Sequence, residues 1–178
     1  REGYGMRILL TGFMGAGKTT VGERLAGRLG LPFVDLDREI ERAAGLAVAE
    51  IFATHGEAWF RSREREALAA ALALPEVVVA TGGGTLTFPE NQAYAAARGA
   101  FVVWLDVPFP VIVARLGGVS RPDRPLFRAE TEAFALYRER LAAYRRADLR
   151  LEITADATPE EIVARLLLRL PARQACVT

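Results

Sequence analysis

The residues best suited to chemistry form one short run near the start of the chain, Gly12-Phe-Met-Gly15-Ala-Gly17-Lys18-Thr19. This run matches G-x-x-x-x-G-K-[ST], the pattern of the Walker A phosphate-binding loop. Its glycines let the backbone wrap phosphate oxygens, its lysine can reach the outer phosphates, and its threonine hydroxyl can bind Mg²⁺. The 23 basic residues of the chain are 22 arginines and one lysine, and that lysine is Lys18. A glycine-rich turn without function is therefore the weaker interpretation.

The elements around this run are those that the pattern requires. Residues 7–11 are a short, mostly apolar run that predicts a buried strand, and residues 19–29 have apolar positions at helical spacing. A helix that begins at the loop directs its free N–H groups and its dipole toward the phosphates. The motif alone indicates nucleotide binding and leaves kinase, GTPase and motor open.

The rest of the chain alternates between predicted strands and helices. Further strands are expected at 32–35, 77–80, 100–105 and 149–153. Further helices are expected at 37–44, 48–73 with a break near 55–56, 90–97, 108–116, 131–147 (strongly amphipathic) and 158–170. This alternation predicts an α/β fold with a parallel sheet and helices on both faces, and 178 residues fit one domain.

Composition excludes several classes of partner and location. The formal net charge of +1 indicates neither nucleic acid nor an anionic membrane as the main partner. No segment reaches the roughly 18 consecutive apolar residues of a membrane helix. The only cysteine, Cys176, excludes an internal disulfide, so we expect a reducing, cytoplasmic location.

Two carboxylates follow the strand at 32–35. Asp35 and Asp37 would lie at the carboxyl edge of a parallel sheet, where the phosphates also bind. There they could hold Mg²⁺ through water and orient a substrate hydroxyl. They could equally cap the next helix, and one residue could do each.

Several arginines and a glycine turn are further candidates. Arg61 follows two aromatic residues and could bind a carboxylate, although Glu57 and Glu64 at helical spacing favour a plain ion pair. The turn Gly82-Gly83-Gly84 after a predicted strand favours close approach of a ligand over a plain flexible turn. Residues 117–128 predict a mobile loop whose arginines could close on a γ-phosphate, or an ordinary exposed basic loop.

In this order the motifs resemble the shikimate kinase family of P-loop NTPases. The resemblance covers about residues 7–170 and rests on G-F-M-G-A-G-K-T-T, D-L-D, F-R-x-x-E at 60–64, T-G-G-G, R-P-L-F in the loop and R-x-x-x-Y at 140–144. It implies a single domain, 1–178, built as a three-layer sandwich around a five-stranded parallel sheet in the order 2-3-1-4-5. It also implies a lid at 117–128, a substrate-binding segment at 37–64, and transfer of the ATP γ-phosphate to the 3-hydroxyl of shikimate, in the biosynthesis of aromatic amino acids.

The resemblance also implies a role for individual residues. ATP phosphates would be bound by Gly15, Ala16, Gly17, Lys18, Thr19 and Thr20. Mg²⁺ would be held by Thr19 and, through water, by Asp35. Asp37 would contact the attacking hydroxyl as candidate base, and shikimate would also contact Arg61, Gly82, Gly83, Gly84 and Arg140. Arg115 would flank adenine, and Arg124 would act with Lys18 and Asp37 in catalysis.

Some alternatives stay open at this point. Arg121 competes with Arg124 for the phosphate, and Arg124 is preferred because it directly precedes Pro-Leu. Family members often carry an adenine-side arginine in the segment corresponding to 155–159, and this chain has none there. A gluconate-type kinase is the nearest enzyme rival, a nucleotide kinase is weaker, and an inactive relative that only binds ligands is the rival from another class. Family precedent favours a monomer.

Overall fold

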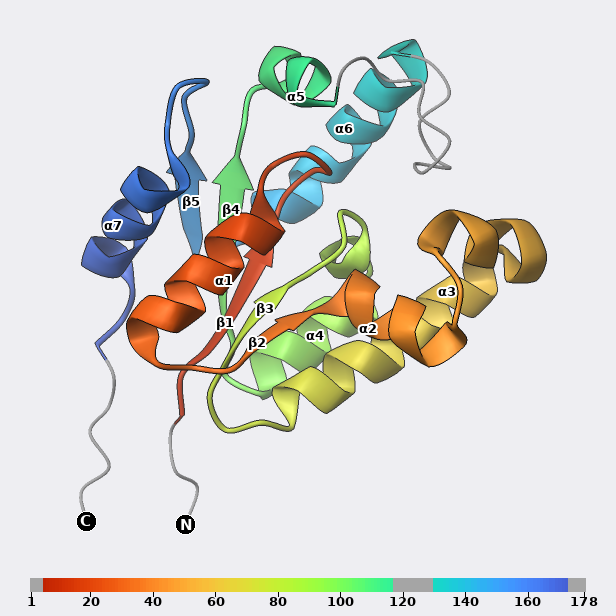
Figure 1. Ribbon diagram of the computed structural model, residues 1–178, viewed down its shortest axis with the longest axis horizontal. Helices are drawn as coiled ribbons and strands as arrows, with labels where there is room; N and C mark the ends of the chain where they lie inside the picture. Colours follow the sequence, from red (N-terminus) through yellow and green to blue (C-terminus); the bar gives the residue numbers. More distant parts are fainter. Residues whose placement is uncertain (1–4, 117–129, 173–178) are drawn as a thin grey trace.

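The computed structural model describes residues 5–116 and 130–172. Within them the chain forms three layers, in which a parallel sheet is covered by helices on both faces (Figure 1). The five strands are β1 (Arg7–Thr11), β2 (Phe33–Asp35), β3 (Val77–Ala80), β4 (Phe101–Asp106) and β5 (Leu149–Glu152). Their order is β2-β3-β1-β4-β5, which confirms the predicted sheet.

Helices connect the strands, as parallel pairing demands. They are α1 (Lys18–Leu29), α2 (Leu36–Ala44), α3 (Val48–Leu72), α4 (Pro89–Ala97), α5 (Phe109–Arg115), α6 (Glu130–Tyr144), α7 (Pro159–Arg169) and the short 3₁₀ helix η1 (Thr85–Thr87). The predicted break in the long third helix is present, because Gly56 there has φ 82° and ψ 170°. None of these helices is long and apolar enough to cross a membrane.

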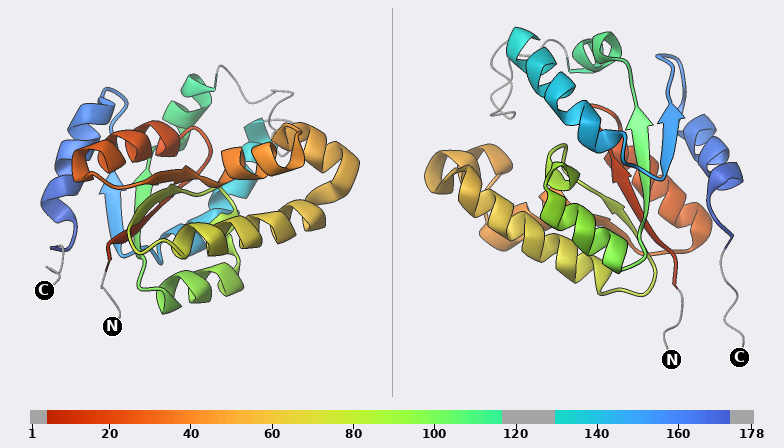
Figure 2. Two further views of the ribbon diagram at one scale, coloured as in Figure 1. Left: turned by 60° about the horizontal axis from the view of Figure 1, so that its bottom comes forward. Right: turned by 180° about the vertical axis from the view of Figure 1, so that it is seen from behind.

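The core lies on both faces of the sheet because alternate strand residues point to opposite sides. On one face Ile8 and Leu10 pack with residues of α1 and α7. On the other face Leu9 and Val79 pack with residues of α3 and α4. The view from behind in Figure 2 shows α3, α4 and α6 on this second side of the sheet. Thr11 lies two residues after Leu9 in β1, so its side chain points to the same, second face of the sheet.

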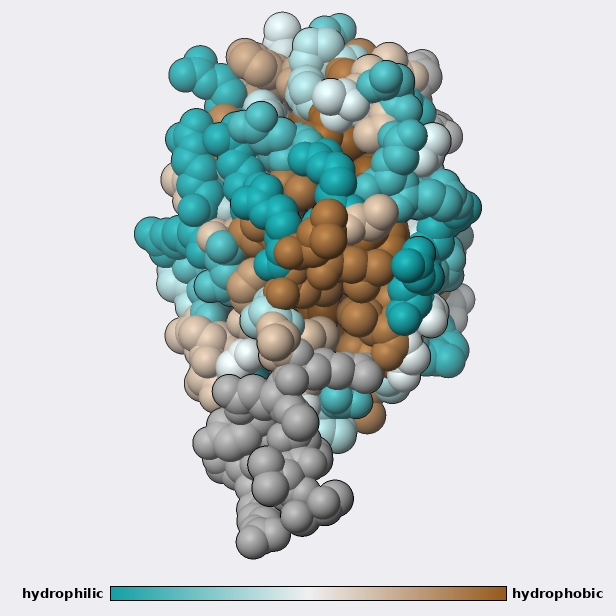
Figure 3. Space-filling model, turned by 90° about the vertical axis from the view of Figure 1, so that its left-hand side faces the viewer, coloured by the Kyte–Doolittle hydropathy of each residue, from teal (hydrophilic) through white to brown (hydrophobic). Residues whose placement is uncertain are grey.

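Helix α7 combines a buried face with an outward leucine. Its first turn is closed by a capping box, in which the Thr158 hydroxyl accepts from the backbone N–H of Glu161 while the Glu161 carboxylate accepts from the N–H of Thr158. Ile162 and Leu166 are buried. Figure 3 shows an apolar area on this side of the molecule, and Leu168 of α7 is 87% exposed.

The prediction of a strongly amphipathic helix at 131–147 is wrong. The buried residues of α6 are Ala133, Arg140 and Tyr144, whereas Phe134 is exposed. The buried side of this helix therefore carries an arginine in place of an apolar stripe. The physical reason is its position, because α6 lies over a polar cavity at the carboxyl edge of the sheet and not only over the core.

Candidate active site

The loop between β1 and α1 has the backbone that its glycines permit. Gly15 and Gly17 have φ values of 82° and 90°, in the left-handed region that other residues rarely adopt. Gly17 is also the N-cap of α1, so the free N–H groups of that helix begin inside the loop. Lys18 is buried and its ammonium donates to the carbonyls of Gly12 and Phe13. The loop therefore presents N–H groups and one cation at a single point, which is the requirement for binding phosphates.

Thr19 and Asp35 meet although they lie 16 residues apart. The Thr19 hydroxyl donates to Asp35 Oδ2 at 2.6 Å, while Oδ1 accepts from the backbone N–H of Arg38 at 3.2 Å. Asp35 is thus both the N-cap of α2 and a partner of the loop threonine, as one of the sequence interpretations allowed. Hydroxyl and carboxylate oxygens suit Mg²⁺, which takes one or two protein carboxylates and fills its shell with water and substrate phosphate. In residues 5–116 and 130–172 no group of three or more His, Cys, Asp or Glu is arranged to hold a metal ion by itself.

Asp37 lies in the first turn of α2, and its Oδ1 is buried without a hydrogen-bond partner among the described residues. Burial, the largest cause, and the negative charges of Glu64 and Asp35 together raise the pKa of this carboxyl to about 6, while the positive charge of Lys18 opposes them. An unpaired carboxyl oxygen beside a cavity can accept a hydrogen bond from a ligand. A pKa near 6 leaves the group mainly ionised at neutral pH and still able to take a proton.

Arg61 and Glu64 form a buried pair on α3. Arg61 Nη1 donates to Glu64 Oε1 at 2.9 Å, and Thr85 Oγ1 donates to Glu64 Oε2 at 2.8 Å. Glu64 is fully buried, and Arg61 is also 3.4 Å from the exposed Glu57. The ion pair that the helical spacing favours is therefore present. It does not exclude ligand binding, because Arg61 also lines the cavity described below.

Arg140 of α6 reaches the same place from the other side. Its Nη1 is buried and lacks a partner within the described part of the chain. A Cβ built on Gly84 would lie 2.7 Å from Arg61 Nη2 and 3.0 Å from Arg140 Nη2, so both guanidinium groups approach this one glycine. Tyr144, one turn after Arg140, donates its hydroxyl to the carbonyl of Gly83 at 2.7 Å. The glycine turn thus leaves room for two cationic groups side by side.

A single cavity of about 470 Å³ joins these parts. Its lining includes the phosphate loop, the carboxylates Asp35 and Asp37, and a group formed by Arg61, the glycine turn and Arg140. Phe52 and Phe60 add an apolar wall. The cavity therefore combines a phosphate-binding end, a titratable carboxyl and a doubly cationic end, which suits transfer of a phosphoryl group to a small anionic acceptor.

Comparison with known proteins agrees with this geometry. A sequence model of the family described as shikimate kinase matches residues 14–171. The shikimate kinase of Synechococcus elongatus is 42% identical over 171 residues, which are 94% of this chain and 88% of that protein. The chain belongs to the shikimate kinase family.

Solved structures agree with this family. The shikimate kinase from Acinetobacter baumannii in complex with shikimate is 34% identical and superposes with a TM-score of 0.86, over 94% of this chain and 93% of that one. A gluconokinase from Sinorhizobium meliloti covers 95% of this chain at 20% identity with a TM-score of 0.55, over 97% of that chain, which shows a shared fold alone.

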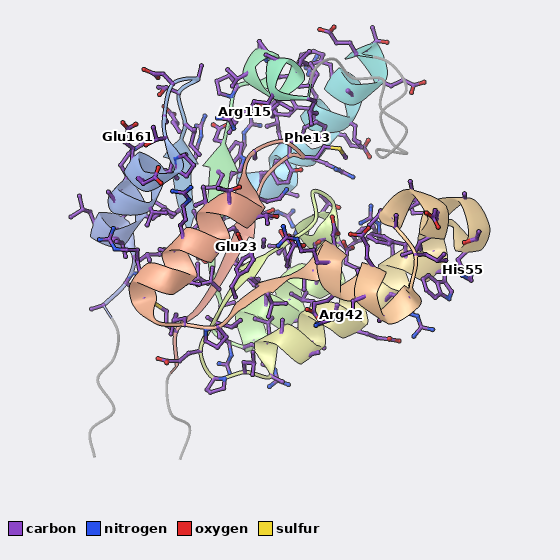
Figure 4. The ribbon with its side chains drawn as sticks, viewed as in Figure 1. Phe13, Glu23, Arg42, His55, Arg115 and Glu161 are labelled. Carbon is purple, nitrogen blue, oxygen red and sulfur yellow. The ribbon has the colours of Figure 1, made fainter. Side chains whose placement is uncertain are left out.

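The family residues predicted from sequence lie mostly around this one cavity. The residues that line it are Gly15, Ala16, Gly17, Lys18, Thr19, Thr20, Asp35, Asp37, Arg61, Gly82, Gly83, Gly84 and Arg140. Arg115 does not line it but donates to the carbonyl of Gly15 at 3.3 Å, and Figure 4 shows it at the same end of the molecule as Phe13 of the loop. Arg121, Arg124 and the loop 117–128 lie outside the described residues.

Sequence reasoning missed what supports these residues. It recognised Glu64 only as a partner for Arg61, and the spacing gave no sign that this carboxylate is fully buried and also bound to Thr85. The sequence also led to no predicted contact for the side chain of Tyr144. The R-x-x-x-Y spacing places Tyr144 on the same face as Arg140, which was the only available signal.

Proposed function

We propose that this chain transfers the γ-phosphate of ATP to the 3-hydroxyl of shikimate, giving shikimate 3-phosphate and ADP. The observation that carries the proposal is the pairing of Arg61 and Arg140 around Gly84, in the same cavity as Lys18. Two guanidinium groups side by side suit a carboxylate. Shikimate is a small ring that bears a carboxylate and hydroxyl groups, so this end would hold its carboxylate while the ring extends toward the phosphates.

The proton of the attacking hydroxyl goes to Asp37. In this step the hydroxyl oxygen forms a bond to Pγ, the bond from Pγ to the bridging oxygen of ADP breaks, and Asp37 takes the hydroxyl proton. The buried, unpaired Oδ1 of Asp37 supports this assignment because it is free to accept. Its raised pKa, about 6, improves it as a base.

The phosphate loop would stabilise the negative charge on the transferred phosphoryl group. Its N–H groups and Lys18 would bind the phosphates, with Arg124 added from the lid segment. Thr19 and Asp35 would hold Mg²⁺, which supplies neutralisation of phosphate charge when bound. Arg115 would flank adenine, a role that its bond to Gly15 supports.

The rival activities lack a comparable observation. A gluconate-type kinase shares the fold, but the family match and the two arginines at the glycine turn favour a cyclic carboxylate. An inactive relative would be expected to have lost Lys18 or Asp37, and both are present.

We infer a single catalytic domain over 1–178 that uses small-molecule substrates without nucleic acid or membrane, in line with the net charge of +1. The single cysteine favours the cytoplasm. A monomer stays a prediction from the family resemblance.

The function is tested by following ADP release from ATP and Mg²⁺ with shikimate, with gluconate, and with neither. We expect release that depends on shikimate and that gluconate does not stimulate. Stimulation by gluconate, or by neither compound while ATP still binds, would contradict the substrate assignment and leave the phosphate loop intact.

A further inference from the structure

Three buried side-chain atoms lack a hydrogen-bond partner within residues 5–116 and 130–172: Asp37 Oδ1, Arg140 Nη1 and Thr11 Oγ1. A buried polar atom without a partner is costly, so each one needs an explanation. The residues Asp37 and Arg140 line the active-site cavity, where a substrate would satisfy them. Thr11 does not line that cavity. Its hydroxyl therefore points to a second binding event.

Thr11 lines a separate cavity of about 390 Å³, together with residues of α4, β4 and the end of α6. The side chain is only 2% exposed, so it lies deep in this cavity. Most of the lining is apolar and consists of Leu86, Val102 and five alanines. The alanines are what leave the space, because a larger side chain on α4 or α6 would fill it. The volume is that of a small-molecule site.

The rim of this cavity is polar. Arg146 Nη1 donates to Gln92 Oε1 at 2.8 Å, joining the end of α6 to α4. This bond uses one of the five N–H donors of the guanidinium, and Arg146 is exposed. Asp148, on the same rim, already accepts from the backbone N–H of Val102 at 2.8 Å. The rim thus offers an exposed cation, Arg146, beside a carboxylate of which one oxygen, Oδ2, is bound to the backbone.

We propose that this second cavity binds a small carboxylic acid with an apolar body and a hydrogen-bonding group at its far end. Its carboxylate pairs with Arg146 at the rim, because a planar guanidinium favours that group. Its body packs against the alanines and Val102. Its far end reaches the hydroxyl of Thr11, which gains the partner that it lacks.

Residues that line the second cavity are neighbours in sequence of residues in the active site. Thr11 directly precedes Gly12, whose carbonyl accepts from Lys18, and Ala143 precedes Tyr144, which donates to Gly83. A carboxylic acid could also enter the active site and bind Arg61 and Arg140. Any binding test must therefore be made with the active site filled.

The test is calorimetric titration with 3-(4-hydroxyphenyl)propionate, using protein saturated with shikimate, ADP and Mg²⁺. We expect binding of one molecule per chain. The corresponding neutral amide should bind about tenfold more weakly, because it loses the charge-assisted bond to Arg146. 3-Phenylpropionate, which lacks the hydroxyl, should also bind more weakly than the hydroxylated acid. Absence of binding, or equal binding of the acid and its amide, would overturn the proposal.

Variants of the second cavity locate the bound acid. Arg146→Ala should lower the affinity for the acid about tenfold. The neighbouring Arg145→Ala removes the same charge from the exposed surface and should leave that affinity unchanged. Thr11→Val should abolish the difference between the hydroxylated and the plain acid, and Ala96→Leu should abolish binding. Equal effects of the two arginine variants, or a hydroxyl preference that survives Thr11→Val, would show that the acid binds elsewhere.

Discussion

The two ends of the active-site cavity are built in opposite ways. The phosphate end uses backbone from one contiguous stretch, with Gly15 and Gly17 in left-handed conformations and the first turn of α1 behind them. The carboxylate end uses two side chains far apart in sequence, Arg61 and Arg140, which meet at the backbone turn of Gly84. Changes at the first end should therefore act mainly on the rate of transfer, and changes at the second mainly on the affinity for the acceptor.

The largest expected effect is that of Lys18→Ala. The chain has no other lysine, and this ammonium is the loop's cation for the transferring phosphate. We expect kcat to fall by about 10³-fold or more. Steady-state kinetics measure the loss, and circular dichroism checks that the variant is folded. A kcat within tenfold of the parent would contradict the account of the phosphate end.

The substitution Asp37→Asn should change catalysis and stability in opposite directions. Without a base, kcat should fall by about 100-fold or more. The raised pKa of Asp37, about 6 against 3.8, means that the folded chain holds this proton more tightly than the unfolded chain. The stability from that proton is present below pH 3.8 and is lost as the pH rises through about 6.

The stability part of this prediction concerns the melting temperature. At pH 8 the wild-type carboxylate is buried and charged, so Asp37→Asn should raise the Tm by roughly 5 °C. At pH 4.5 the gain should be much smaller, because the wild-type group is then protonated. Thermal melts at both pH values check this, and an equal gain at both would contradict the electrostatic explanation.

Arg140→Ala tests the carboxylate end. We expect KM for shikimate to rise about 10- to 100-fold while KM for ATP changes little, because a charge-assisted contact is lost. Arg138→Ala, on the exposed side of the same helix, is the matched control. Methyl shikimate lacks the negative charge and sharpens the comparison. It should be a poor substrate of the parent protein, and Arg140→Ala should lower its turnover only a little further. Equal rises in both KM values would refute the assignment.

Gly84→Ala should have the smallest effect. Its φ of −105° suits alanine, so the cost comes from space alone. The new Cβ would approach Arg61 and Arg140 within 3.0 Å and push their guanidinium groups apart. We expect KM for shikimate to rise about tenfold. Gly27→Ala, inside α1 with no atom within 4 Å, is the control and should leave both KM values unchanged. The same KM for shikimate in Gly84→Ala and Gly27→Ala would contradict the crowding of the turn at Gly84.

The same contrast explains what could be predicted from the sequence. The phosphate loop is contiguous, so its residues and flanking elements were recognisable, and the sheet order followed from the family resemblance. Arg61 was ambiguous because its helical neighbours Glu57 and Glu64 fit an ion pair equally well. Only the fold reveals that Glu64 is buried against Thr85 from another segment. For the same reason, the amphipathic pattern expected for α6 failed where Arg140 turns inward.

The most direct test of the proposed reaction is the position of the phosphate in the product. Phosphorus–proton correlation spectroscopy of the product from ATP and shikimate identifies the carbon that bears the new ester. The family resemblance predicts phosphorylation on the 3-hydroxyl, and a cavity that holds the substrate in one orientation beside Asp37 predicts that this is the sole product. A product phosphorylated at the 4- or 5-hydroxyl, or a mixture of esters, would contradict the way in which the cavity is proposed to hold its substrate.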